Sequence, residues 1–146
     1  MNKPTMLVVE DNPDHLELTL TTLEANGVDH HIVVARDGQQ ALDYLMGEGQ
    51  HSDRNTDLQP ELVLLDLNMP RMSGLQVLER MRNDPRTLFV PVIMLTSASE
   101  QSDTVRELKG GLNSYTSKPL DYDEFKARLE EVREYWRTSS FAPLMS

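Results

Sequence analysis

The chain has 146 residues, of which 38% are hydrophobic and none is cysteine, and its formal net charge is −10 at pH 7. A chain of this length can bury a core of its own, the lack of cysteine excludes disulfides and thiolate metal sites, and the acidic balance disfavours nucleic acid and anionic membranes as direct partners. No apolar run approaches the ~18 residues of a membrane span, and the first five residues lack the basic-then-apolar pattern of a signal peptide. These features predict a single cytoplasmic domain.

The N-terminal residues predict a buried strand followed by a helix. Thr5–Val9 is a short apolar run, typical of a strand covered on both faces, and the acidic pair Glu10-Asp11 follows it. Asn12 and Pro13 have the residue types of a helix cap and of a first helical position. Leucines at helical spacing continue to Asn26-Gly27, which is a stop signal.

A second strand and helix come next, before a polar stretch. Residues 32–35 are apolar and predict a strand, and Asp37 is expected to cap a helix whose buried face carries Ala41, Leu42 and Leu45. Residues 47–59 are polar and aperiodic, so they predict a long surface loop. Such a loop is either functional or a tolerated insertion, and the residues do not decide between the two.

The most informative stretch is Glu61–Gly74. Four consecutive apolar residues, Leu62 to Leu65, run into Asp66, and a turn follows at once. This pattern predicts a strand buried on both faces, and in open parallel sheets ligands bind just outside the carboxyl ends of the strands. A carboxylate at that place needs a cation, hydrogen-bond donors or a proton. Asp66 is therefore either a functional carboxylate or a simple cap of the next turn.

The next segment predicts a third helix and a fourth strand. Ser73 and Gln76 have the spacing of a capping box, for a helix that buries Leu75, Leu78 and Met81. Val90–Leu95 is expected to be the fourth strand, with a proline near its start where a missing N–H is tolerated. Thr96 follows this strand directly.

The last third of the chain predicts one short strand between two helices. A weak helix around Val105 and Leu108 precedes a strand at residues 113–116, which leads to Lys118-Pro119. Asp121 and Glu124 predict a second capping box. The final helix is expected to bury an apolar face made of Phe125, Leu129, Val132 and Trp136.

The alternation of five strands with five helices predicts an α/β fold, in which a doubly wound parallel sheet carries helices on both faces. The polar residues of interest then fall at the carboxyl ends of strands, where such folds bind their ligands. These residues are Glu10, Asp11, Asp66, Thr96 and Lys118.

Three carboxylates in one crevice repel one another unless a cation joins them. Oxygen ligands without His or Cys suit Mg²⁺, and we expect Asp11 and Asp66 as direct ligands with Glu10 acting through water. Taken singly, the acidic pair also fits the N-terminus of a helix. Lys118 alone also fits a surface lysine, and Thr96 alone a packing residue at a strand end.

Together these groups suit the transfer of a phosphoryl group to Asp66. A carboxylate oxygen of Asp66 would be the nucleophile, and Mg²⁺ would balance the charge on the phosphoryl oxygens. Lys118 would supply a positive charge to another phosphoryl oxygen, and the hydroxyl of Thr96 would donate a hydrogen bond to a third.

Four motifs occur together at these strand ends: Val9-Glu10-Asp11-Asn12, Leu64-Leu65-Asp66-Leu67-Asn68-Met69-Pro70-Arg71-Met72-Ser73-Gly74, Leu95-Thr96-Ser97-Ala98 and Tyr115-Thr116-Ser117-Lys118-Pro119. With them, residues 5 to about 137 resemble a receiver domain of the two-component response-regulator family. The resemblance implies a flavodoxin-like (βα)5 fold with strand order 2-1-3-4-5, in which Asp66 accepts phosphate from a histidine kinase. It also implies a signalling protein rather than an enzyme.

The resemblance assigns further roles in the site. It implies that Asp11, Asp66 and the backbone carbonyl of Asn68 bind Mg²⁺. It implies that Thr96 moves toward the phosphoryl group and that the ring of Tyr115 turns inward into the space that Thr96 vacates. Without the resemblance, Tyr115 would be expected to be a half-buried aromatic residue of a strand.

No output domain follows the receiver-like residues, so we expect a single receiver domain over residues 1–146, with 138–146 as a tail. The long loop after the second helix and the extended last helix, which ends in Tyr135-Trp136, are similar to receivers paired with bacterial phytochrome kinases. Those relatives often form homodimers through the fourth helix, the fifth strand and the fifth helix. Trp136 is a candidate contact there, although packing within the monomer suits it equally well.

Three other functions fit parts of the pattern. A phosphatase of the haloacid-dehalogenase type has a second Asp two residues after its nucleophile, where this chain has Asn68, which cannot transfer a proton in that way. A flavin-binding electron carrier would need a phosphate loop rich in Ser, Thr and Gly after the first strand, where this chain has Glu10-Asp11. A binding module that is not phosphorylated is disfavoured because none of the expected motifs is missing.

Overall fold

One parallel sheet organises the molecule. The structure is a computed structural model, and it describes residues 3–97 and 110–138. Within these ranges the strands are ordered β2-β1-β3-β4-β5, and all four neighbouring pairs are parallel. The strands are β1 (Thr5–Val9), β2 (His31–Ala35), β3 (Leu62–Asp66), β4 (Val92–Thr96) and β5 (Asn113–Ser117). The expected α/β fold and strand order are thus confirmed.

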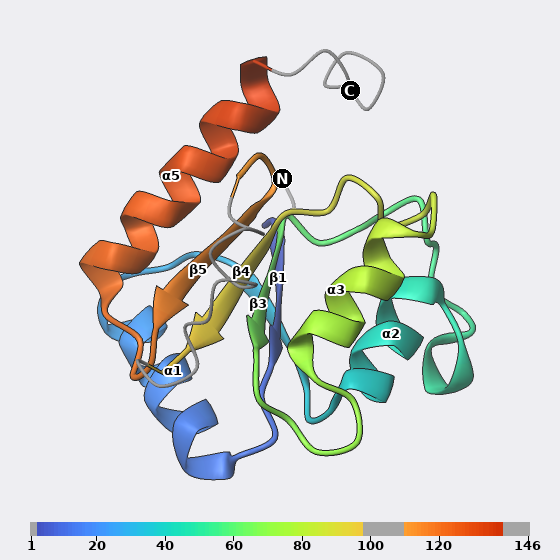
Figure 1. Cartoon of the computed structure of the whole chain (residues 1–146), viewed down its shortest axis with the longest axis horizontal. Coiled ribbons are helices and arrows are strands. Elements are labelled where there is room, and N and C mark those ends of the chain that lie inside the picture. Colours follow the sequence, from blue (N-terminus) through green and yellow to red (C-terminus); the bar gives the residue numbers. More distant parts are fainter. Residues whose placement is uncertain (1–2, 98–109, 139–146) are drawn as a thin grey trace.

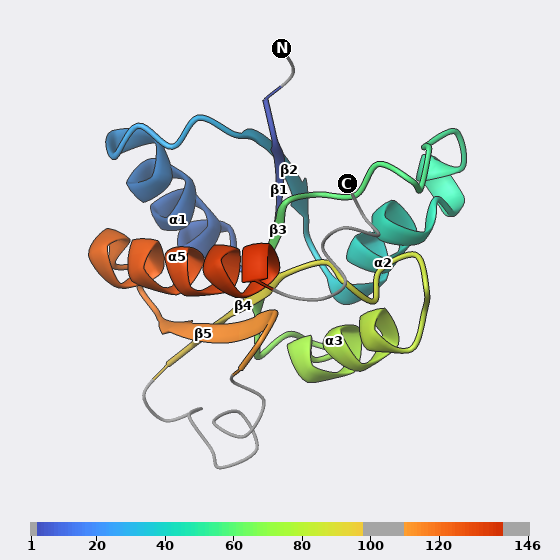
Figure 2. The ribbon, with the colours of Figure 1, turned by 90° about the horizontal axis from the view of Figure 1, so that it is seen from above.

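Helices cover both faces of this sheet. Figures 1 and 2 show α1 and α5 on one face and α2 and α3 on the other. The helical elements are α1 (Pro13–Ala25), α2 (Gly38–Met46), the short 3₁₀ helix η1 (Gly49–His51), α3 (Gly74–Arg82) and α5 (Tyr122–Thr138). The helix expected around Val105 and Leu108 lies outside the described residues. No helix of the described part has both the length and the apolar character that crossing a bilayer requires.

The core consists of two apolar layers, one on each face of the sheet. Along β3, Leu64 packs in the layer under α1 and α5, whereas Val63 and Leu65 pack in the layer under α2 and α3. All five residues of β3 are buried. Each fully buried leucine contributes about 1.5–3 kcal/mol relative to an exposed one. The unbroken apolar run before Asp66 is therefore explained by a strand covered on both faces.

The helix ends follow local signals. Asn12 caps α1 by accepting hydrogen bonds from the backbone N–H groups of Asp14 and His15, and Gly27 ends this helix with a left-handed φ of 69°. Both hydrogen bonds of the capping box of α3 are present. The side-chain oxygen of Ser73 accepts from the backbone N–H of Gln76, and that of Gln76 accepts from the backbone N–H of Ser73. These caps confirm the expected helix starts.

Some boundaries and faces differ from the sequence expectations. Strand β4 begins at Val92 instead of Val90, because Pro91 has no N–H to donate to the ladder. Helix α3 buries Val77 together with Leu78 and Met81, whereas Leu75, which was expected to be buried, is only partly buried at the edge of the core. In the first turn of α5, the backbone N–H of Glu124 bonds the Asp121 side chain as expected, but the Glu124 carboxylate accepts from Ser117.

The polar loop at residues 47–59 is held by one arginine. The Nε of Arg54 donates to the carbonyl of Tyr44 at 2.6 Å, and its Nη1 donates to the carbonyl of Leu58 at 2.9 Å. The guanidinium also lies 4.0 Å from the centre of the Tyr44 ring, a cation–π contact. The loop is therefore tied to the end of α2 through these contacts.

Candidate functional site

The carboxyl edge of the sheet gathers the expected polar residues. Glu10 follows β1, Asp66 ends β3 and Thr96 ends β4, and these three strands are neighbours in the sheet. Lys118 follows β5, which lies beside β4. Because all the strands are parallel, their carboxyl ends meet at one edge, as the sequence had predicted.

Three carboxylates share a small space at this edge. Glu10, Asp11 and Asp66 each place one carboxylate oxygen within 4.8 Å of the others. The side chain of Glu10 is fully buried and that of Asp66 is 1% exposed, whereas Asp11 is half-buried. Such crowding of like charge away from water is unfavourable without a cation.

Lys118 is the cation that bridges two carboxylates of this cluster. Its Nζ lies 3.0 Å from Oε1 of Glu10 and 3.0 Å from Oδ1 of Asp66, so it bridges two of the three carboxylates. Its backbone N–H donates to the carbonyl of Thr96 at 2.8 Å, and its peptide bond to Pro119 is cis. One lysine therefore joins the ends of β1, β3 and β4.

The two central ionisable groups have displaced pKa values. Burial raises the pKa of Asp66 to about 7, and the neighbouring Glu10 adds to this rise while Lys118 opposes it. Burial acts to lower the pKa of Lys118, but the carboxylates of Asp66 and Glu10 outweigh it and raise the pKa above its ordinary value. Lys118 therefore carries its charge at neutral pH, and its ammonium is shared between the carboxyl groups of Glu10 and Asp66.

The donor set at this edge fits a hard divalent cation. Oε1 of Glu10 is buried and, although Lys118 is near, it meets no hydrogen-bond geometry within the described residues. Oxygen donors from Glu10, Asp11 and Asp66, without a cysteine in the chain, are the ligands that Mg²⁺ and Mn²⁺ prefer. Asn68 is exposed next to this cluster, and its N–H lies 3.4 Å from Oδ1 of Asp66.

The loop from β3 to α3 is packed closely beneath Asp66. A Cβ on Gly74 would lie 2.4 Å from the carbonyl oxygen of Asp66, which only glycine avoids. The N–H of Gly74 donates to the carbonyl of Leu67 at 2.8 Å. Earlier in the same loop, Arg71 has a φ of 67°. The N–H of Met72 donates to the carbonyl of Pro70 across it, at 2.7 Å. This geometry is a strained γ-turn.

The two residues expected to form a switch lie on adjacent strands. Thr96 is fully buried at the end of β4, and Tyr115 is half-buried in β5, level with Met94. Met94 and Tyr115 pack in the apolar layer under α2 and α3. Because Thr96 is two residues after Met94, its side chain points to the same face. Thr96 and Tyr115 therefore share one face of the sheet.

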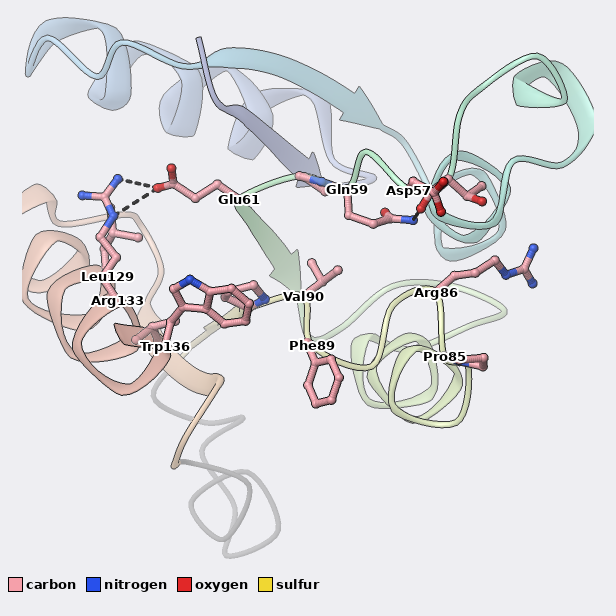
Figure 3. A pocket seen from close by; sticks show the side chains of 14 residues that line it. Asp57, Gln59, Glu61, Pro85, Arg86, Phe89, Val90, Leu129, Arg133 and Trp136 are labelled. Atoms are coloured by element: carbon pink, nitrogen blue, oxygen red, sulfur yellow. Dashed lines mark hydrogen bonds and ion pairs between the residues drawn. The ribbon is translucent and has the colours of Figure 1, made fainter. Parts of the chain in front are cut away.

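The opposite, amino edge of the sheet carries a pocket that the sequence did not predict. Its volume is about 510 Å³, and Figure 3 shows it between α5 and the loop that joins α3 to β4. Residues that line this amino-edge pocket include Gln59, Glu61, Arg86, Phe89, Arg133 and Trp136. The half-buried Trp136 thus packs at the end of the molecule opposite Asp66. Glu61, Phe89 and Arg133 come from separate elements, and no motif links them in the sequence.

Comparisons with known proteins agree with this geometry. The sequence model described as the response regulator receiver domain matches residues 6–130. The bacteriophytochrome response regulator AtBRR is 38% identical, with a TM-score of 0.81 over 91% of this chain and 94% of that one. The bacteriophytochrome response regulator RtBRR is 41% identical, with a TM-score of 0.80 over 90% of this chain and 78% of that one. The Mn²⁺-bound form of response regulator Rcp1 is 29% identical, with a TM-score of 0.68 over 93% and 96%.

Proposed function

Because this chain belongs to the response regulator receiver domain family, we propose that Asp66 accepts a phosphoryl group from the phosphohistidine of a histidine kinase. The observation that carries this proposal is the position of Lys118, whose Nζ lies 3.0 Å from both Glu10 and Asp66. A cluster of three carboxylates, two of which contact one ammonium, suits an acceptor that gains negative charge during its reaction.

In the proposed step, a carboxylate oxygen of Asp66 attacks the phosphorus atom. The new O–P bond forms as the P–N bond to the donor histidine breaks, and the bonding electrons stay on the imidazole, which then takes a proton. Lys118 leaves Glu10 and binds a phosphoryl oxygen, since the ammonium follows the new negative charge. The hydroxyl of Thr96 donates to a further phosphoryl oxygen.

The cofactor that we propose is Mg²⁺. Asp11, Asp66 and the backbone carbonyl of Asn68 would bind it directly and Glu10 through water, a set supported by the three clustered carboxylates and by the Mn²⁺-bound form of Rcp1. When bound, the cation offsets the repulsion between the carboxylates and the incoming phosphoryl oxygens. Asn68, two residues after the nucleophile, cannot act as a general acid or base, so the acyl phosphate should persist as a signal rather than turn over as in a phosphatase.

The output of the proposed reaction is a change of surface. Thr96 moves toward the phosphoryl group and Tyr115 turns inward, which alters the face of β5, α5 and the helix that the sequence predicts around Val105 and Leu108. We propose that this face binds a partner or a second copy of the chain. Trp136 lines the amino-edge pocket, which supports a role in packing within the monomer, and its role as a homodimer contact stays a proposal.

We propose that this protein acts in the cytoplasm and that its kinase is a bacteriophytochrome. Support comes from AtBRR and RtBRR, two bacteriophytochrome response regulators with TM-scores of 0.81 and 0.80. We also propose that residues 1–146 act as one receiver domain, with a core over 5–137 and a tail over 138–146. Direct contact with nucleic acid or with a membrane is not part of this proposal, because the net charge is −10.

The test is phosphoryl incorporation from acetyl phosphate, measured by intact mass with and without Mg²⁺. The wild-type chain should gain about 80 Da in a Mg²⁺-dependent manner, as one covalently bound phosphoryl group requires, and Asp66→Asn should gain nothing. Asp53→Asn, which changes an exposed aspartate in the loop at residues 47–59, is the matched control and should behave as wild type. No gain by the wild-type chain under any condition would sink the proposal.

A further inference from the structure

The carboxylate of Glu124 joins the first turn of α5 to the end of β5. Both the backbone N–H and the hydroxyl of Ser117 donate to its Oε1, at 3.2 and 3.3 Å. The backbone N–H of Glu124 donates in turn to Oδ1 of Asp121 at 3.0 Å. Ser117 is the residue directly before Lys118. Glu124 therefore contacts the immediate chain neighbour of the lysine that serves the site.

Lys118 is consequently fixed from two sides. On the side of β4, its backbone N–H donates to the carbonyl of Thr96 at 2.8 Å. On the side of α5, Glu124 holds the backbone and side chain of Ser117. Between these anchors the ammonium of Lys118 reaches the buried carboxylates of Glu10 and Asp66.

From this geometry we infer that Glu124 is a positioning residue for Lys118. It holds the end of β5 so that the lysine can move from Glu10 to a phosphoryl oxygen without the backbone shifting. The inference rests on the proposed function, because the reaction that it serves is the phosphorylation of Asp66. Glu124 bonds Ser117 and Asp121, so it acts through Lys118 and does not itself touch the reacting atoms.

A carboxylate suits this position for two physical reasons. Hydrogen bonds to a charged acceptor are roughly twice as strong as neutral ones, and Ser117 supplies two donors to the same oxygen. An acidic side chain in the first turn of a helix is also favoured by the helix dipole. Both effects hold Glu124, and through Ser117 the end of β5, in place while the side chain of Lys118 moves.

The inference predicts a graded series of variants. Glu124→Ala removes the anchor and should slow phosphoryl incorporation from acetyl phosphate about tenfold, less than the hundredfold that a full ångström of misplacement can cost. Glu124→Gln keeps an acceptor oxygen and should rescue most of this loss, to within about threefold of wild type. Asp123→Ala removes an exposed acid from the same turn and should leave the rate unchanged.

A double-mutant cycle separates positioning from a merely structural role. In a Lys118→Met background, Glu124→Ala should cause no additional loss of rate, since the group that it positions is gone. A loss that is the same in both backgrounds would overturn the inference, and so would a wild-type rate in Glu124→Ala. If Glu124→Ala does not fold, Glu124→Gln and Ser117→Ala replace it in the cycle. Ser117→Ala removes one of the two donors to Glu124, and each variant should cause a smaller loss of rate that again disappears in the Lys118→Met background.

A second measurement distinguishes failure of this inference from failure of the proposed function. The side-chain ammonium resonance of Lys118 can be followed by ¹⁵N NMR in the metal-free, unphosphorylated protein. The bridging ammonium should give a protected signal in wild type and Asp123→Ala that weakens or shifts in Glu124→Ala. An unchanged signal would refute positioning by Glu124 even if Asp66 accepts no phosphoryl group.

Discussion

The two edges of the sheet both remove carboxylates from water, but they balance the charge differently. At the amino edge, Glu61 accepts from Nε of Arg133 at 3.1 Å and from Nη2 of the same side chain, and Nε2 of His30 lies 3.4 Å away (Figure 3 draws the pair with Arg133). At the carboxyl edge, three carboxylates cluster, and Lys118 bridges two of them, Glu10 and Asp66. One acid with two basic partners therefore contrasts with two buried acids that share one lysine beside a third acid.

The pKa values show the consequence. Burial acts to raise the pKa of Glu61, but Arg133 and His30 outweigh it and lower the pKa below the ordinary value of 4.5. Burial raises the pKa of Asp66 to about 7, with Glu10 adding to the rise. A balanced pair of this kind stabilises a fold slightly, whereas an unbalanced buried cluster costs folding free energy and is typical of functional sites.

The largest expected effect concerns Asp66 in the metal-free protein. The folded pKa of about 7 lies above the ordinary 3.8, so the protein favours the protonated acid. The folded state is therefore not penalised by Asp66 below pH 3.8, where the acid is protonated in both states. As the pH rises from 3.8 to 7, ionisation of Asp66 in the unfolded chain lowers the free energy of unfolding. Asp66→Asn stays neutral at every pH. Its gain in stability over wild type should be small at pH 4 and should rise to at most about 4 kcal/mol at pH 7. Denaturant unfolding at several pH values measures this difference.

Added Mg²⁺ sharpens this experiment. The cation favours the ionised form of Asp66, so it should remove most of the difference between wild type and Asp66→Asn at pH 7. Glu61→Gln is the matched control at the balanced edge, and it should not become more stable than wild type over the same range. A difference between wild type and Asp66→Asn that does not change with pH would contradict the charge imbalance described above.

The next largest effect is expected for the glycine beneath the unbalanced edge. A Cβ on Gly74 would meet the Asp66 carbonyl at 2.4 Å and Cα of Leu67 at 2.9 Å, both of which are backbone atoms. Gly74→Ala should therefore destabilise the protein by about 3 kcal/mol, as overpacking against fixed atoms does, and should slow phosphoryl incorporation because the loop after Asp66 must shift. Thermal and denaturant unfolding give the stability change.

Gly38 provides the control for this substitution. A Cβ there would also be tight, at 2.9 Å from atoms of Met72 and Val77, but these belong to side chains that can move. Gly38→Ala should cost clearly less than Gly74→Ala. Equal losses for the two variants would mean that the close approach of α3 to Asp66 has no special rigidity.

The smallest effect is expected at the balanced edge. Arg133→Met removes a partly exposed partner of Glu61 and should cost about 0.5–1 kcal/mol at pH 7. The lowered pKa of Glu61 means that its contribution is present above pH 4.5 and is lost as the pH falls below that value. The variant and the wild type should thus converge in stability at acid pH. Arg137→Met, one turn further on and more exposed, should have no measurable effect at any pH.

The elements of this fold could be predicted because their signals are local. Asn12, Asp37 and Ser73 cap helices through hydrogen bonds to residues two or three positions away. The start of β4 was predicted two residues early because apolar character extends past Pro91, whereas ladder hydrogen bonds do not. Glu124 had the spacing of a capping box, but its carboxylate bonds Ser117 instead, and a residue pattern does not decide between two nearby donors.

The sequence by itself determined the carboxyl edge, because parallel strands bring their ends together whatever their separation along the chain. Lys118 meets Asp66 across 52 positions for this reason. Only the tertiary structure decided the amino edge, where Arg133 meets Glu61 across 72 positions and Trp136 lines a pocket with Phe89. That pocket depends on the length of α5 and on the paths of the loops at residues 56–61 and 85–91. No periodic pattern or local motif in the sequence predicts either.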